Sequence, residues 1–344
     1  MSNETDARNL HQDALVLDSH NDSIVSHIRR GNQSIADESR KQHGRHSGTV
    51  AFLRGRLGPA KDIELNIPKM KEGGVDAAFF AVDVTLAWKN HLAYALDAFG
   101  FFKAEVEANS DDILIARTAG DIRLAKSEGK LAAVLVIENS EGVERSLNVL
   151  AMLHEVGVRS ITLTHNLNTW AGAGNEEHDS GGGLTHFGKD LVREMNQLGI
   201  LVDVSHVSER MFFDALEVTE KPVIASHSNS KAICDHPRNL SDEQIKVLAE
   251  SGGSIGITFV PPFIDDKEPS LERMLDHIDH IVEQVGEDHV GLGSDFDGGG
   301  EMFKDATEYP TITDALLARG YSAESVRKIL GGNHLRVFEQ ACGS

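Results

Sequence analysis

Residues 132–138 read AAVLVIE, six apolar residues in a row followed by a glutamate. A short run that is apolar throughout is typical of a strand buried on both faces, as in a parallel sheet. Seven more runs of this kind occur along the chain, at residues 14–18, 76–84, 160–165, 200–206, 222–227, 254–260 and 289–295. The sequence therefore predicts a parallel sheet of eight strands.

Segments with the apolar spacing of helices separate most of these predicted strands. They cover residues 91–108, 143–156, 187–198, 208–218, 241–251 and 271–285, and residues 311–344 are expected to add closing helices. Eight alternating strand and helix units close naturally into a (β/α)8, or TIM, barrel of about 250 residues or more. We therefore predict an α/β protein with a single TIM-barrel domain over residues 1–344 and long loops at the carboxyl ends of the strands. A doubly wound open sheet is the alternative, but no dinucleotide-binding glycine motif follows the first strand.

The composition is that of an acidic globular protein. The chain has 344 residues, 40% of them hydrophobic and 25% charged, and its formal net charge is −21. This negative charge repels phosphate backbones, so no nucleic-acid partner is expected. Two cysteines, Cys234 and Cys342, cannot supply a disulfide framework. No stretch is apolar enough for a signal core or a membrane helix, so we expect a cytoplasmic protein without a membrane partner.

Residues 29–62 are polar and rich in glycine and arginine, and are expected to form a long loop bordering the site.

Six of the predicted strands end in residues that can bind a metal ion. These residues are His20, Asp22, Glu138, His165, His206, His227 and Asp295. The carboxyl ends of barrel strands converge on one face, so side chains distant in the sequence can meet there. A set of histidines and carboxylates without thiolates suits a hydrolytic zinc, manganese or iron site.

Each of these residues also has a simpler explanation when it is taken alone. A histidine after a strand is more often a core residue, and Asp295 could be a turn residue among glycines. The occurrence of six such positions at separate strand ends is what favours a metal hydrolase. His20 and Asp22 would point the same way on one extended strand, because strand side chains alternate with period two. By the same rule Ser226 and His227 point to opposite faces, and there is no G-x-S-x-G motif, so a nucleophilic serine is not supported.

Seven motifs resemble, in this order, those of the membrane (renal) dipeptidase family, the M19 metallopeptidases of the amidohydrolase superfamily. They are LDSHND (17–22), IE (137–138), LTHNLNT (163–169), DVSHVS (203–208), ASHS (225–228), RNLSDEQ (238–244) and HVGLGSDFDG (289–298). The resemblance spans residues 14–340 and implies a TIM barrel that holds two zinc ions, although manganese or iron would suit the same ligands. Dimers occur in the family, so a homodimer is compatible with the resemblance.

The resemblance also implies a ligand set for the two ions. His20 and Asp22 would bind one zinc ion, and His206 and His227 would bind the other. Glu138 would bridge both ions. The two ions bring a charge of +4, and Asp22, Glu138 and a hydroxide bring −3. The site would then carry about +1, which suits a carbonyl oxygen that gains negative charge.

Three further roles follow from the resemblance. His165 would contact the substrate and stabilise the tetrahedral intermediate. Arg238 would bind the terminal carboxylate of the substrate, which a forked guanidinium fits well. Asp295 would carry the proton of the bridging water to the leaving amine. Two departures bear on substrate choice, because Asn139-Ser140 stands where the family usually has Gly-Gly, and Asn168-Thr169-Trp170 lacks the usual proline.

The leading hypothesis is therefore a binuclear zinc dipeptidase whose metal-bridging hydroxide attacks the scissile carbonyl of short peptides, L-Xaa-D-Xaa dipeptides included. An alternative is an amidohydrolase that opens another amide or ester, such as a β-lactam or a lactone, with the same metal centre. A non-catalytic scaffold protein is the third hypothesis. Such a protein should have lost some of the ligands or Asp295, and all of them are present.

Overall fold

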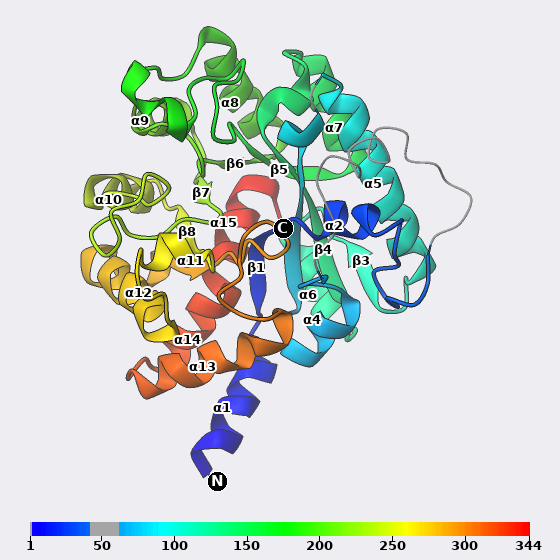
Figure 1. Ribbon diagram of the computed structural model, residues 1–344, viewed down its shortest axis with the longest axis vertical. Coiled ribbons are helices and arrows are strands. Elements are labelled where there is room, and N and C mark those ends of the chain that lie inside the picture. Colours follow the sequence, from blue (N-terminus) through cyan, green and yellow to red (C-terminus); the bar gives the residue numbers. More distant parts are fainter. Residues whose placement is uncertain (1, 42–61, 88) are drawn as a thin grey trace.

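The computed structural model describes residues 2–41, 62–87 and 89–344 (Figure 1). Among these residues, parallel strands form one sheet: β1 (Leu17–Asn21), β2 (Ala77–Asp83), β3 (Ile113–Ile115), β4 (Leu131–Glu138), β5 (Val158–Thr162), β6 (Leu201–Asp203), β7 (Ile224–Ala225), β8 (Ser254–Ile257) and β9 (Val290–Leu292). Their order is β2-β1-β9-β8-β7-β6-β5-β4-β3, and a further pairing of β2 with β4 closes eight of them into a barrel. The predicted TIM barrel is thus confirmed. β3 stands outside the closed ring and pairs only with the first residues of β4.

Most helices of the described residues surround this barrel, whereas α1 projects from it at the bottom of Figure 1. The helices are α1 (Ser2–Asp13), α2 (Ser23–Arg29), α4 (Ile67–Gly73), α5 (His91–Ala108), α6 (Ala119–Ser127), α7 (Leu147–Val156), α8 (His186–Leu198), α9 (Glu209–Val218), α10 (Asp242–Glu250), α11 (Pro261–Ile264), α12 (Leu271–Val285), α13 (Tyr309–Ala318), α14 (Ala323–Arg327) and α15 (Asn333–Cys342). Six of them match the segments predicted from apolar spacing. Among the described residues, no helix is both long enough and apolar enough to cross a membrane.

The differences from the predicted elements are local. The predicted helix over residues 143–156 begins only at Leu147, because Ser146 caps it and residues 140–143 form a separate 3₁₀ turn. Of the predicted loop over residues 29–62, residues 42–61 lie outside the described residues. The loop starts one residue later than predicted, because α2 extends to Arg29. β3 was not predicted, since its three residues are too few to make a distinct apolar run.

The inside of the barrel is a separate apolar cluster at the amino ends of the strands. Leu17, Phe79 and Val134 belong to it, together with residues of α15. The ring of Phe338 in α15 packs edge-on against that of Phe79, with 5.5 Å between the ring centroids. α15 therefore closes the amino-terminal end of the barrel, as expected for a closing helix. Apolar packing at this end leaves the carboxyl ends of the strands free for polar side chains.

The first and last strands are joined by a buried carboxylate. Asp18 of β1 is fully buried and accepts hydrogen bonds from the Ser294 backbone N–H at 2.7 Å and from its hydroxyl at 2.8 Å. Asp18 is also opposite Leu292 of β9 in the parallel register. Burial raises the pKa of Asp18 to about 6, against the opposing effect of these hydrogen bonds. Polar contacts as well as strand pairing thus fix the barrel seam.

Gly293, directly after β9, lies so close to β7 that a side chain has no room. A Cβ at Gly293 would lie 1.8 Å from the carbonyl oxygen of Ser226. We expect Gly293→Ala to lower the free energy of unfolding by about 3 kcal/mol or more, because backbone must move in a packed core. Urea unfolding checks this. The matched control is Gly100→Ala in α5, where an added Cβ meets nothing within 4 Å, so the free energy of unfolding should not fall. Equal effects of the two changes would contradict the prediction.

Candidate metal centre

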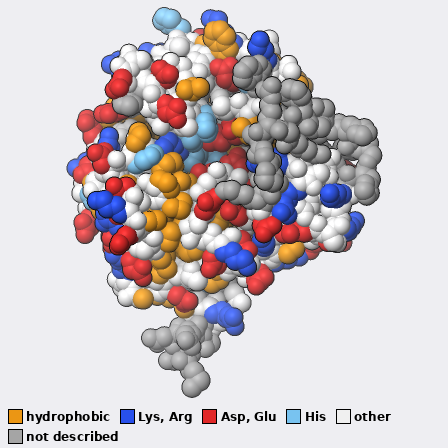
Figure 2. Space-filling model, viewed as in Figure 1, with side chains coloured by type: hydrophobic (Ala, Val, Ile, Leu, Met, Phe, Trp, Pro, Cys, Tyr) orange, Lys and Arg blue, Asp and Glu red, His pale blue; other side chains and the backbone are white. Residues whose placement is uncertain are grey.

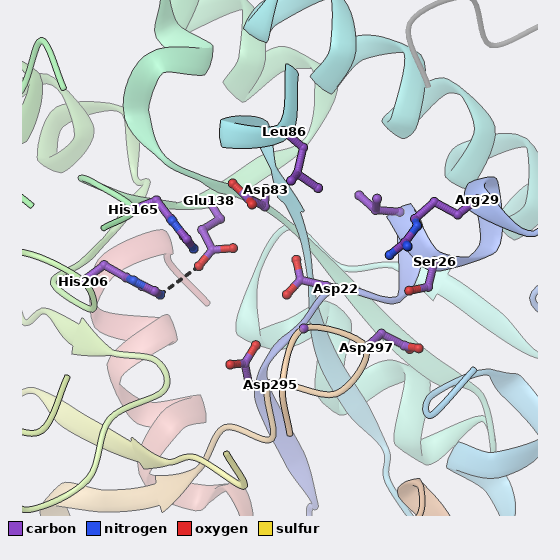
Figure 3. Close-up of a pocket in the computed structure, with 12 residues that line it drawn as sticks. Asp22, Ser26, Arg29, Asp83, Leu86, Glu138, His165, His206, Asp295 and Asp297 are labelled. Carbon is purple, nitrogen blue, oxygen red and sulfur yellow. Dashed lines mark ion pairs between the residues drawn. The ribbon is translucent and has the colours of Figure 1, made fainter. Parts of the chain in front are cut away.

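A hollow lies at the carboxyl-terminal mouth of the barrel, where histidine and acidic side chains gather (Figure 2). The cavity beneath it has a volume of about 290 Å³. His165, His206, Glu138 and Asp295 line one side, and Ser26, Arg29 and Leu86 line the other (Figure 3). All seven predicted histidine, aspartate and glutamate residues lie at this mouth. They come from the ends of β1, β4, β5, β6, β7 and β9.

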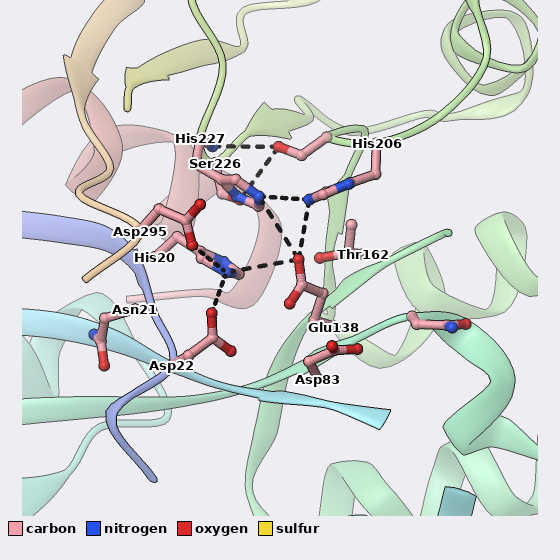
Figure 4. A network of polar contacts seen from close by, with 12 residues as sticks. His20, Asn21, Asp22, Asp83, Glu138, Thr162, His206, Ser226, His227 and Asp295 are labelled. Carbon is pink, nitrogen blue, oxygen red and sulfur yellow. Dashed lines mark hydrogen bonds and ion pairs between the residues drawn. The ribbon is translucent and has the colours of Figure 1, made fainter. Parts of the chain in front are cut away.

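Glu138, the last residue of β4, is at the middle of this group (Figure 4). Its Oε1 atom lies 3.1 Å from Nε2 of His206, 3.6 Å from Nε2 of His227 and 3.7 Å from Nε2 of His20. Two ligands that each lie about 2.1 Å from one tetrahedral zinc ion are themselves about 3.4 Å apart. The observed spacing of these nitrogen and oxygen atoms therefore fits donors of a shared cation.

The donors fall into overlapping groups of three whose ligand atoms lie within 4.8 Å of one another. One group is His20, Asp22 and Glu138, and another is Glu138, His206 and His227. Glu138 is common to both groups, and the same oxygen, Oε1, is the one nearest to His20, His206 and His227. A third group joins His20 and His227 to Asp295.

Several of these donors have no hydrogen-bond partner within the protein. Both ring nitrogens of His20 and Oδ1 of Asp22 are buried without a partner. His20 is fully buried, and its ring stacks on that of His227 with 3.8 Å between centroids. A buried polar atom without a partner costs about 1–3 kcal/mol, so native proteins rarely leave one unsatisfied. Metal coordination would satisfy one ring nitrogen of His20 and the Asp22 oxygen, and nitrogen and carboxylate donors are those zinc prefers. The residues present thus fit a metal centre.

The protonation of His206 and His227 also suits ligands, whereas at His20 burial lowers the pKa but Glu138 and Asp22 outweigh it and raise the pKa to about 10. Burial lowers the pKa of His206 and His227 well below the usual range of histidine, and the positive charge of Arg238 lowers it further. Both rings are therefore neutral. Nδ1 of His206 is 2.8 Å from Oδ1 of Asn166, so Nδ1 carries a proton, and Nε2 lies 2.7 Å from Nε2 of His227 and 3.1 Å from Oε1 of Glu138.

The carboxylates are crowded together, and this crowding opposes their ionisation. Burial raises the pKa of Glu138 well above its usual range, and the nearby Asp22, Asp83 and Asp295 raise it further. Burial also raises the pKa of Asp295 to about 7, although His20 opposes this shift. Like charges held close together in a buried site are costly unless cations compensate them.

Asp22 approaches His20 by another route than the one predicted. The register of β1 shifts between Asp18 and Asn21, and Asp22 already occupies the N-terminal position of α2, with φ −105° and ψ 22° and no capping hydrogen bond from its side chain. The period-two argument therefore fails at Asp22. The turn into α2 nevertheless brings its Oδ2 within 3.7 Å of Nε2 of His20.

Two of the predicted residues have an unusual backbone conformation. His206 has φ 65° and Asp295 has φ 59°, in the left-handed region. Few non-glycine residues adopt positive φ, and each such position costs of order 1–3 kcal/mol. Strain of this kind clusters at functional sites, where it directs a side chain that ordinary geometry would direct elsewhere.

The structure adds Asp83, which the sequence interpretation missed. Asp83 is the last residue of β2, stands opposite Glu138 in the register, and lines the cavity. With Glu138 and His165 it forms a further group of close potential ligands. The rule that selected the other residues, a charged group at a predicted strand end, would have found it in AVD at residues 81–83.

Arg238 does not line this cavity. It is buried beside a smaller, adjoining cavity, and His206 lines both. One guanidinium nitrogen, Nη2, donates to the carbonyl oxygen of His227 at 3.0 Å, while Nε has no hydrogen-bond partner. The guanidinium is thus held next to the histidines with part of its donor capacity unused.

The family model of membrane dipeptidase, peptidase family M19, matches residues 4–342. The chain belongs to peptidase family M19. The resemblance stated from the motifs is thereby confirmed, and the protein is a metal-dependent hydrolase of the dipeptidase class. Its curated relatives include the dipeptidase tcpJ of Claviceps purpurea, which is 35% identical over 304 residues, covering 83% of this chain and 71% of that protein.

Two solved metallopeptidase structures, the first of them from family M19, share the fold over nearly the whole chain. The dipeptidase AC has a TM-score of 0.82 and 30% sequence identity, covering 96% of this chain and 99% of its own. A metallopeptidase from Rhodobacter sphaeroides, liganded with a phosphinate mimic of the dipeptide L-Ala-D-Ala, has a TM-score of 0.83 and 28% identity. That match covers 96% of this chain and 100% of the other.

The departure from the M19 pattern after Glu138 has a structural explanation. Asn139 has φ 80°, a conformation that glycine adopts without strain. Its side chain accepts from the Glu141 backbone N–H at 3.0 Å and donates to Thr85 Oγ1 at 3.0 Å. These bonds hold the turn that a glycine would make freely.

In the second altered loop, Trp170 is 52% exposed and the Arg145 guanidinium lies 4.9 Å from its ring centroid.

Proposed function

We propose that this M19 enzyme is a binuclear zinc dipeptidase for short peptides with a free terminal carboxylate, L-Xaa-D-Xaa dipeptides included. The position of Glu138 carries this proposal, because its Oε1 is within 3.7 Å of imidazole nitrogens from three strand ends. The relative liganded with a mimic of L-Ala-D-Ala supports the substrate class.

His20 and Asp22 would hold one zinc ion, His206 and His227 would hold the other, and Glu138 would be shared by both. When bound, the two ions would lower the pKa of a water molecule toward about 7 and polarise the scissile carbonyl. Elemental analysis of the purified protein should find two zinc ions per chain. A chain that binds a single ion at full activity would contradict the binuclear assignment.

The remaining chemistry falls to His165 and Asp295, which both line the cavity (Figure 3). The His165 ring is half-buried and stacks on His206, with 4.4 Å between centroids. It can donate a hydrogen bond to a carbonyl oxygen that gains charge. Asp295 can accept the proton of the attacking water and return it to the leaving nitrogen. A Cβ at Gly298 would lie 2.3 Å from both Asp22 Oδ2 and Asp295 Oδ1, so the glycine keeps this space open.

Arg238 is proposed to bind the terminal carboxylate of the substrate. Arg238→Lys keeps the charge but loses the forked geometry, so kcat/KM for L-Ala-D-Ala should fall about 100-fold, chiefly through KM. The same peptide with a C-terminal amide offers no carboxylate, so its already low kcat/KM should change little. Steady-state kinetics on both substrates checks this. An equal loss on the peptide and its amide would argue against carboxylate binding.

A substrate panel tests the proposed function as a whole. Free L,D- and L,L-dipeptides should be cleaved, while a β-lactam and a lactone should react more slowly. Only the dipeptidase proposal requires a carboxylate that faces Arg238. Turnover of the lactam or lactone without dipeptide cleavage would overturn it.

A further inference from the structure

A buried chain of polar groups lies beneath His227. Ser226 Oγ is 2.8 Å from Nδ1 of His227 and 2.6 Å from Oδ2 of Asp203. The expectation that Ser226 and His227 point to opposite faces is therefore wrong. Strand alternation does not reach them, because β7 ends at Ala225. Figure 4 shows the two side chains next to each other at the edge of the metal centre.

Asp203, the last residue of β6, is fully buried and is surrounded by donors. Oδ1 accepts from the backbone N–H groups of Ser205 at 2.9 Å and Ser226 at 3.1 Å. Oδ2 accepts from the hydroxyls of Ser226 at 2.6 Å and Thr162 at 2.8 Å. Backbone N–H groups can only donate, so the Oδ1 side is always an acceptor. Asp203 thus connects the ends of β5, β6 and the loop after β7.

We infer that Asp203 and Ser226 are positioning residues that fix the tautomer of His227. The inference rests on the proposed role of His227 as a ligand. Ser226 has one hydroxyl proton, and the short contact to Asp203 takes it, whereas Ser205 Oγ is more distant at 3.3 Å. Toward His227 the hydroxyl can then only accept, so Nδ1 carries the ring proton. Nε2 is left with its lone pair, which lies 2.7 Å from Nε2 of His206 and 3.6 Å from Oε1 of Glu138.

The two histidines of the same proposed zinc site are thus oriented by different means. His206 donates from Nδ1 to the side-chain oxygen of Asn166, which lies in the loop after β5. His227 depends on a carboxylate inside the barrel, with Ser226 as the connecting group. Only the His227 arrangement can be reversed by moving a proton along a chain of hydroxyl and carboxyl groups.

Asp203→Asn tests this arrangement without changing the shape of the side chain. The two backbone N–H groups require an oxygen at the Oδ1 position, so the new NH2 group must face Ser226. Ser226 then accepts from the amide and turns its own proton toward Nδ1 of His227. Nε2 of His227 becomes protonated and cannot bind a cation. An amide that imposes the wrong tautomer in this way abolishes most activity in catalytic triads.

The readouts are the tautomer of His227 and the affinity for zinc. In metal-free, full-length protein labelled with nitrogen-15 histidine, two-dimensional NMR should show His227 protonated on Nδ1 in the wild type and on Nε2 in Asp203→Asn. His227→Gln assigns the signal. Zinc affinity, from competition with a chelator, should fall about 100-fold or more in Asp203→Asn and about 10- to 100-fold in Ser226→Ala.

Ser160→Ala is the matched control, because Ser160 is buried in β5 and its hydroxyl donates only to the Leu201 carbonyl oxygen, at 3.2 Å. It should change neither readout. Circular dichroism checks folding, and Ser226→Ala decides the outcome if Asp203→Asn does not fold. Wild-type zinc affinity in either variant, or Nε2 protonation in the wild type, would overturn the inference. Neither readout uses a peptide, so a protein that shows the predicted tautomers but cleaves no dipeptide would refute only the proposed function.

Discussion

Asp295→Asn is expected to lower kcat for L-Ala-D-Ala by about 10³- to 10⁴-fold, with both zinc ions retained. Asparagine fills the same space, but it cannot accept a proton from water and return it to the leaving nitrogen. The five residues assigned as ligands are untouched, so metal content should not change. Steady-state kinetics and elemental analysis of the same preparation provide the two measurements.

Asp297→Asn is the control for this prediction, because Asp297 belongs to the same loop and lines the same cavity. Its carboxylate is already engaged, accepting from Ser23 Oγ at 2.6 Å and from the Glu64 backbone N–H at 3.1 Å. We expect kcat to fall by less than about 10-fold in this variant, since general acid–base catalysis is intact. A near wild-type rate in Asp295→Asn would show that the proton moves by another route.

Glu138→Gln should have the larger effect, because it removes the group shared by both proposed ions. The amide presents one oxygen and one NH2 group, so at most one ion keeps its donor, and a compensating negative charge is lost. We expect fewer than two zinc ions per chain and a fall in kcat/KM of more than about 10⁴-fold, as when a member of a catalytic unit is removed. Elemental analysis and kinetics check both parts.

Glu141→Gln serves as the comparison, since Glu141 lies three residues further on and accepts from the Trp170 backbone N–H at 3.1 Å, outside the metal centre. It should keep two zinc ions and most of its activity. If Glu138→Gln also kept two ions per chain, Glu138 could not be the bridging ligand.

The barrel could be predicted because its strands are buried on both faces, so each reads as an apolar run without alternation. β4 is the clearest example, with all eight residues buried from Leu131 to Glu138. The predicted runs at residues 200–206 and 222–227 extend beyond β6 and β7, because the loops that carry His206 and His227 are buried too. Apolar pattern alone does not separate a paired residue from a buried loop residue.

The site residues could be identified from the sequence, but the geometry of their side chains could not be predicted from it. His206 and Asp295 adopt positive φ, and Asp22 stands at the start of α2, so alternation rules valid inside a strand do not apply to them. The alternation rule also excludes a contact between Ser226 and His227, although Oγ of Ser226 lies only 2.8 Å from Nδ1 of His227. The roles of His165 and Arg238 depend on the family resemblance, because residue type alone leaves several roles open.

The seam between β1 and β9, together with the α15 plug, has a consequence for how the protein is made. β1 leaves the ribosome early, but its partners, Leu292 in β9 and Ser294 after it, are translated roughly 15–55 s later at about 5–20 residues per second. α15 emerges later still, and until then Phe79 has no cover from Phe338. The nascent chain must therefore hold unpaired strand edges and an open apolar interior until β9 and α15 have been translated. Such a polypeptide is a natural client for chaperones that bind extended apolar segments.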